Sequence, residues 1–166
     1  MRNYIVMGIL SFFFGGAAQA QEPSLIALER TQVELIAQQI DDADAFLKKY
    51  VGKKSSYGPK DIDSAIKAWI ASTDKKPKSP DELIGLMGSF FGNYLVKKHN
   101  VEWMNFKDKQ GVDLCVIHRQ FFVYSFPYAA IYKAVVQKRE DALEAVEAAL
   151  ASQIAESLKD KEVKER

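Results

Sequence analysis

The sequence has little of the chemistry on which metal sites, disulfide frameworks and redox centres depend. Its 166 residues include one cysteine, Cys115, and two histidines, His99 and His118. A single cysteine excludes an intramolecular disulfide and a site built from four thiolates. The histidines form no H-E-x-x-H or H-x-H pattern, so a zinc site would need carboxylates from distant segments. We therefore predict no metal and no cofactor.

The sequence also has nearly equal numbers of basic and acidic residues. The chain carries 23 basic and 22 acidic side chains, and removal of Arg2 with the leader described below would leave 22 of each. Binding to nucleic-acid phosphates requires a surplus of Lys and Arg. We therefore expect no nucleic acid among the partners. After residue 20 no apolar stretch is long enough to cross a bilayer, so no transmembrane segment is expected in the mature form.

The first twenty residues have the features of a cleaved export signal. Arg2 precedes the apolar run Tyr4–Phe14, and small residues follow, ending in Ala18-Gln19-Ala20. A basic start, a short apolar run and an A-x-A site are typical of a secretory signal peptide. We expect cleavage after Ala20 and a mature protein that is periplasmic or secreted.

Apolar residues at helical spacing predict helices on both sides of a strand-rich middle segment. The clearest start signal is Ser79-Pro80-Asp81-Glu82, in which Ser79 can cap the helix and Pro80 fits its first turn. The residues from Lys159 onward are almost all charged and are expected to fray. The predicted helices cover residues 24–51, a segment that begins near Pro59, and residues 80–98, 127–137 and 140–159.

Three glycines lie on one face of the predicted helix 80–98. Gly85, Gly88 and Gly92 are three and four residues apart, with Ser89 beside them. Each glycine lowers helix propensity by about 1 kcal/mol relative to alanine. We expect the backbone of another element to approach this face closely, and a ligand phosphate is the alternative.

Three segments rich in β-branched and aromatic residues predict an antiparallel meander. Val101–Phe106 and Val112–Ile117 flank a turn that ends at Gly111, and Phe121–Ser125 follows. Cys115 lies in the middle segment and is expected to be a buried small hydrophobe, with a reactive thiol or an intermolecular disulfide as alternatives.

The predicted fold class is α+β. A helical N-terminal part precedes a small antiparallel three-stranded sheet, and the C-terminal helices pack on that sheet. The predicted organisation is a signal peptide over 1–20, a helical segment over 21–60, an α+β domain over 61–160 and a frayed charged tail over 161–166.

The succession of these motifs resembles the DUF3806 family, a bacterial domain of unknown function. The resemblance covers Asp61–Leu150 and supports the fold without implying an activity. The chain departs from the family pattern at Lys133-Ala134, where a lysine-arginine pair is expected. The resemblance rests on Leu86-Met87-Gly88-Ser89-Phe90-Phe91-Gly92-Asn93-Tyr94-Leu95, Val101-Glu102-Trp103, Asp108, Gly111, Asp113 and Phe126-Pro127.

The aromatic stretch around the third predicted strand is the richest binding candidate. Tyrosine and tryptophan are common interface anchors because they combine apolar area with a polar tip. Part of the stretch must be core, since strands alternate their faces. The residues predicted to line a binding edge are Tyr94, Trp103, Arg119, Tyr124 and Tyr128.

Catalytic alternatives centre on the hairpin. Glu102, Asp108 and Asp113 could converge with His118 for acid–base work, although an aspartate in a turn usually caps its own backbone. His118 is expected to lie exposed at a sheet edge, and His99 to end a helix, where a cation complements the helix dipole.

We therefore predict a small exported protein that acts in the periplasm by binding a protein partner. An immunity or inhibitor protein against a toxin delivered to the periplasm is one version of this hypothesis. A hydrolase-type enzyme that uses the hairpin carboxylates, and a structural protein of the cell envelope, are the alternatives.

Overall fold

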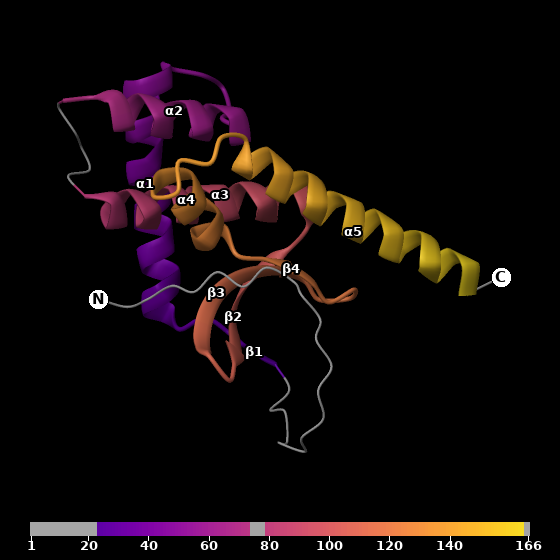
Figure 1. Cartoon of the computed structure of the whole chain (residues 1–166). Coiled ribbons are helices and arrows are strands. Elements are labelled where there is room, and N and C mark those ends of the chain that lie inside the picture. Colours follow the sequence, from indigo (N-terminus) through magenta and orange to yellow (C-terminus); the bar gives the residue numbers. More distant parts are fainter. Residues whose placement is uncertain (1–22, 74–78, 165–166) are drawn as a thin grey trace.

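The computed structural model describes residues 23–73 and 79–164, which form five helices and one four-stranded antiparallel sheet (Figure 1). The α+β class is therefore confirmed. The leader over 1–20 and the end of the tail, residues 165–166, lie outside the described residues. The elements in chain order are β1 (Ser24–Ile26), α1 (Arg30–Val51), α2 (Pro59–Ala71), α3 (Pro80–His99), β2 (Glu102–Asp108), β3 (Gly111–His118), β4 (Val123–Ser125), α4 (Pro127–Val135) and α5 (Ala142–Lys164).

The described sheet has four strands, in the order β1-β2-β3-β4, where the sequence predicts three. Ser24, which we placed at the start of a helix, instead opens β1 and pairs with Lys107 of β2. The helix therefore begins at Arg30. Leu25 and Leu28 do fit a helical period, but the unpaired edge of β2 offers residues 24–26 a ladder of backbone hydrogen bonds. That edge comes from a distant part of the chain, so no local sequence pattern predicts the pairing.

A pair of amide side chains fixes the junction between β1 and α1. Gln32 Nε2 donates to Asn105 Oδ1 at 3.1 Å, and Asn105 Nδ2 donates back to Gln32 Oε1 at 3.0 Å. Gln32 Oε1 also accepts the backbone N–H of Glu29 at 2.9 Å, at the first turn of α1. Asn105 is buried, and these bonds satisfy its amide. The same contacts therefore start the helix and hold it against β2.

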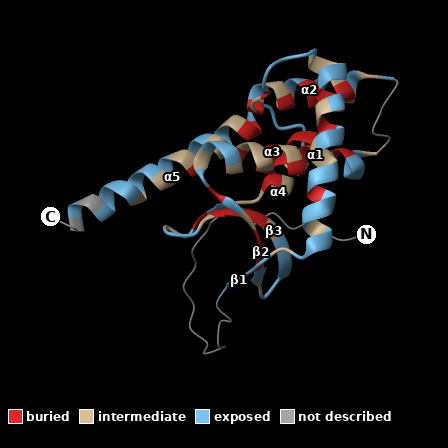
Figure 2. Cartoon of the chain, turned by 180° about the vertical axis from the view of Figure 1, so that it is seen from behind, coloured by how far each residue is buried: buried red, intermediate tan, exposed pale blue. Residues whose placement is uncertain are grey.

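The two faces of the sheet belong to different apolar clusters. Trp103 and Val116 are cross-strand partners on the face that joins the helices in the main core. Met104 and Cys115 are partners on the opposite face, which carries a smaller cluster with Phe106 and Ile117. The buried residues in Figure 2 run along the sheet and the inner sides of the helices. The middle segment of the predicted meander, β3, therefore lies between β2 and β4 and contributes to both clusters.

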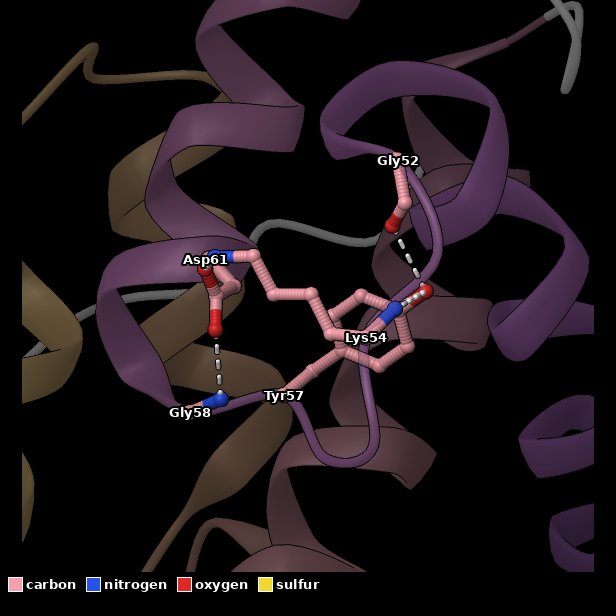
Figure 3. A network of polar contacts seen from close by, with 5 residues as sticks. All are labelled: Gly52, Lys54, Tyr57, Gly58 and Asp61. Atoms are coloured by element: carbon pink, nitrogen blue, oxygen red, sulfur yellow. Dashed lines mark hydrogen bonds and ion pairs between the residues drawn. The ribbon is translucent and has the colours of Figure 1, made fainter.

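The loop between α1 and α2 is held by polar contacts of its own (Figure 3). Tyr57 Oη donates to the carbonyl of Gly52 at 2.8 Å, and the Asp61 carboxylate accepts the Gly58 N–H at 3.0 Å. Lys54 Nζ reaches the same carboxylate at 2.5 Å. The hydrogen bond from Lys54 lowers the pKa of Asp61, although burial opposes this effect. The break between the helices is therefore a defined turn that caps α2.

The local signal predicts the start of α3 correctly, but the composition of the C-terminal segment does not predict the end of α5. Ser79 Oγ accepts the Glu82 N–H at 3.2 Å, so the predicted cap of α3 is confirmed. The fraying expected from Lys159 onward is not found, because α5 continues to Lys164. Lysine and glutamate are good helix formers, and oppositely charged side chains alternate along this segment.

Candidate binding surface

The five residues predicted to line one binding edge lie in three separate places. Trp103 and Tyr128 pack together against α3, with ring centroids 5.9 Å apart. Tyr94 lies between α3 and α5, where its hydroxyl donates to Glu147. Tyr124 and Arg119 lie near β4 and the end of β3. The structure therefore divides the predicted set into core residues, a helix–helix contact and a surface.

The glycine face of α3 receives side chains, not the backbone approach that we predicted. A Cβ at Gly88 would lie 2.4 Å from Tyr128 Cδ1, and one at Gly92 would lie 2.1 Å from Trp103 Cζ2. The absence of side chains at these positions lets both rings sit against the helix. Ser89 Oγ donates to Gln39 Oε1 at 2.6 Å and lies 2.7 Å from Tyr128 Oη. Trp103 and Tyr128 are therefore used in packing.

A polar cluster occupies the contact between α3 and α5. The carboxylate of Glu147, which is largely buried, accepts from Tyr94 Oη at 3.0 Å and contacts His99 Nε2 at 3.3 Å. Lys98 forms an ion pair with the same carboxylate. Burial alone would raise the pKa of Glu147, but hydrogen bonds from Lys98 and Tyr94 hold it below its usual value. The cluster joins the two helices, and the hydroxyl of Tyr94 is used in this contact.

Exposed aromatic rings gather at β4. Phe106 and Tyr124 have centroids 4.9 Å apart, and Phe126 lies 5.5 Å from each of them. Phe122 meets Tyr124 edge-on at 6.4 Å. Phe122 is 51% exposed and Tyr124 39% exposed, whereas Phe106 is buried. We call Phe122 and Tyr124 the aromatic edge, because they extend the cluster around Phe106 and Phe126 to the surface.

The backbone at the aromatic edge is unusual. Phe122 has a φ of 56°, in the left-handed region that bulky residues rarely adopt. Phe121 and Phe122 therefore form the turn before β4, where we predicted strand. Strained backbone persists where the surroundings impose it, and it is enriched at functional sites. The strain places an apolar ring in solvent.

A groove of about 460 Å³ separates the aromatic edge from α5. One wall consists of Phe122, Val123 and Tyr124. The other wall is a polar face of α5. Its four residues are spaced at the three- and four-residue steps of one helix face. They are Gln153, Glu156, Ser157 and Asp160.

Sequence reasoning singled out Tyr124 and included Phe122 only as part of the aromatic stretch, and it missed Glu156 and Asp160. The helical spacing of the acidic pair was visible in the sequence. Nothing local showed that this helix face would lie opposite β4, because the groove depends on how α5 packs.

The candidate catalytic residues of the hairpin do not converge into one cluster. Asp108 Oδ1 accepts the N–H groups of Gln110 at 2.7 Å and Gly111 at 3.2 Å, so it caps its own turn. Glu102 lies at the other end of the seven-residue strand β2 and forms an ion pair with Arg119. Asp113 pairs across the ladder with Phe106. In residues 23–73 and 79–164 no group of three or more His, Cys, Asp or Glu could hold a metal ion.

The thiol of Cys115 is buried, and the ring of His118 is partly buried. Cys115 is fully buried, and burial, with a smaller effect of the Asp113 charge, raises its pKa to about 11. The thiol therefore stays protonated at neutral pH, as a small core residue would. His118 is only partly exposed, which corrects the expected edge position, and its ring stacks on Phe121 with centroids 4.6 Å apart.

A comparison with known protein families covers the part of the chain from α2 to α5. The family model described as "Domain of unknown function (DUF3806)" matches residues 61–146. The chain belongs to the DUF3806 family. The match begins in α2 and ends within α5, so it includes the glycine face and the β4 edge.

A solved structure shares the fold. A protein of Bacteroides thetaiotaomicron VPI-5482, with a crystal structure at 1.50 Å resolution, superimposes with a TM-score of 0.56 at 16% identity. The alignment covers 82% of the present chain and 50% of that protein, so the chain spans half its length. No curated protein matches the sequence. Across the part of the chain that is described, no helix is long and apolar enough to span a bilayer.

Proposed function

We propose that this DUF3806 protein binds a protein partner through the aromatic edge formed by Phe122 and Tyr124. The observation that supports the proposal is the exposure of both rings, 51% and 39%, at the rim of a buried aromatic cluster. Aromatic side chains supply much of the binding energy of interfaces, because they bury a large area with few rotatable bonds. The support of the Tyr124 ring by Phe106 and Phe126 lowers the entropy that this side chain loses on binding.

We further propose that the protein is exported and meets its partner outside the cytoplasm. The basis is the leader-like sequence with Arg2, the apolar run Tyr4–Phe14 and the small residues up to Ala20. Mass spectrometry of protein recovered from a periplasmic extract tests this step. The expected N-terminus is Gln21, and protein that still carries Met1 in the cytoplasmic fraction would contradict export.

The binding proposal is tested by comparing two double variants as bait in a periplasmic extract. Phe122→Ala with Tyr124→Ala removes the aromatic edge. Val33→Ala with Leu35→Ala removes two exposed apolar side chains of α1, which are 52% and 54% exposed, and serves as the matched control. We expect the edge variant to lose the captured partner and the control to keep it, with unfolding midpoints confirming that both are folded. A partner retained equally by the two variants would disprove a role for the edge.

A further inference from the structure

The groove beside the aromatic edge has an acidic wall. Glu156 and Asp160 are four residues apart on the exposed part of α5, and Figure 2 shows this half of the helix to be largely exposed. Like charges at this spacing destabilise a helix by about 0.2–0.5 kcal/mol, so a cation placed between them is favoured. Glu156 Oε1 accepts from Ser152 Oγ at 3.0 Å, which holds the carboxylate along the helix.

The opposite wall carries the exposed ring of Phe122, which suits the same cation, whereas the Tyr124 ring packs on Phe106 at the sheet face of the smaller cluster. Phe122 and Tyr124 are arranged edge to face, with an interplanar angle of 87°. The face of an aromatic ring attracts ammonium and guanidinium groups, and more strongly where water is partly excluded. A groove with an exposed aromatic ring on one side and carboxylates on the other is therefore complementary to a positive charge carried on an apolar stem.

Lysine and arginine side chains have this form. Their methylene stems pack along apolar surface while the charged head stays with polar groups. Arginine fits better, because its planar guanidinium stacks on rings and forms paired hydrogen bonds with carboxylates. The groove, at about 460 Å³, has room for one such side chain together with its flanking backbone.

We propose that the groove between β4 and α5 binds an arginine or lysine side chain from an exposed segment of the partner protein. This inference rests on the proposed function and adds the chemistry of the partner. The aromatic edge packs on the segment and supplies apolar contact area, whereas Glu156 and Asp160 select for its positive charge.

The direct test is a titration of the isotopically labelled protein with a defined peptide, followed by NMR. The probes are the blocked peptide Gly-Leu-Arg-Leu-Gly and the same peptide with glutamine in place of arginine. We expect saturable shifts at Phe122, Tyr124, Glu156 and Asp160 with the arginine peptide, and at least about fivefold weaker binding of the glutamine peptide. Equal binding of the two peptides, or no shift of these residues at about 10 mM peptide, would overturn the proposal.

Charge variants separate this proposal from the broader one. Glu156→Gln with Asp160→Asn should weaken binding of the arginine peptide about fivefold. Asp41→Asn with Asp42→Asn changes the net charge by the same amount on the exposed face of α1, and it should leave binding of the arginine peptide unchanged. If the first variant captures the partner from the extract as well as the unmodified protein does, the cation site is wrong even where loss of the aromatic edge abolishes capture. If loss of the edge has no effect either, the proposed function itself fails.

Discussion

At Gly92 the space that a side chain would need is occupied by the indole of Trp103. A Cβ there would lie 2.1 Å from Trp103 Cζ2 and 3.0 Å from Pro127 Cγ. We expect Gly92→Ala to destabilise the protein by about 1–3 kcal/mol despite its better helix propensity, because the indole must move within a packed core. Gly85→Ala is the control, since its Cβ would meet only the end of the flexible Gln39 side chain, at 2.9 Å. Urea unfolding measures both, and equal stability of the two variants would contradict the packing role.

Asp63 is a half-buried carboxylate with charged neighbours of the same sign. It lies on α2, accepts the Leu143 N–H at the start of α5, and leaves Oδ2 buried without a hydrogen bond within the described structure. Burial first, and then the nearby Asp141, raises its pKa to about 6 from 3.8, with a smaller effect from Glu144. Around this site Glu144 is paired with Lys60, and Glu140 with Lys67.

The raised pKa of Asp63 makes part of the stability depend on pH. The folded state holds the Asp63 proton more tightly than the unfolded chain, so this contribution is full below about pH 4 and is lost as pH rises through about 6. Asp63→Asn should therefore stabilise the protein at pH 7, by about 1–2 kcal/mol once the shift is discounted for partial exposure. The difference from the unmodified protein should vanish near pH 4. Urea unfolding at both pH values checks this, and a destabilised Asp63→Asn at pH 7 would be the opposite result.

At the scale of elements, one carboxylate of α5 makes several polar contacts with α3. Glu147 is the shared partner of Tyr94, Lys98 and His99. Glu147→Ala should cost about 1–3 kcal/mol, because it removes the acceptor of the partly buried Tyr94 hydroxyl and the charged partner of Lys98. Glu147→Gln keeps an acceptor and should cost less.

The expected consequence is a looser α5. Hydrogen exchange of the backbone amides in Ala142–Lys164 should be faster in Glu147→Ala than in Ser152→Ala, which alters an exposed position of the same helix. Unchanged exchange in α5 would mean that apolar contacts such as Leu143 and Leu150 hold the helix without the cluster.

The elements also differ in how far they could be predicted. The starts of α2, α3 and α4 follow from Pro59, Ser79-Pro80 and Pro127, because caps and first-turn prolines act within a few residues. The strand β1 could not be predicted, since residues 24–26 fit a helical period and become a strand only by pairing with β2. The candidate site could be predicted only in part. Tyr124 was expected at a surface and lies there. Trp103 was equally suited to a binding surface by its residue type, but it packs against Gly92.

At the scale of the whole molecule, the helices lie on one side of the sheet and α5 runs out past β4 (Figure 1). This placement leaves the aromatic edge and the acidic face of α5 on opposite walls of one groove. Neither wall alone would suggest a ligand class. Their juxtaposition supports a basic segment as the partner, and a chain whose formal net charge is only +1 repels such a segment weakly.

The sequence by itself determined the α+β class, the hairpin and the glycine face of α3. These depend on periodicity, capping and turn chemistry, which are encoded in neighbouring residues. Only the tertiary structure decided that side chains fill the glycine face, that β1 completes the sheet and that α5 faces β4. Those outcomes depend on which surfaces bury the most apolar area against each other, a property of residues far apart in the chain.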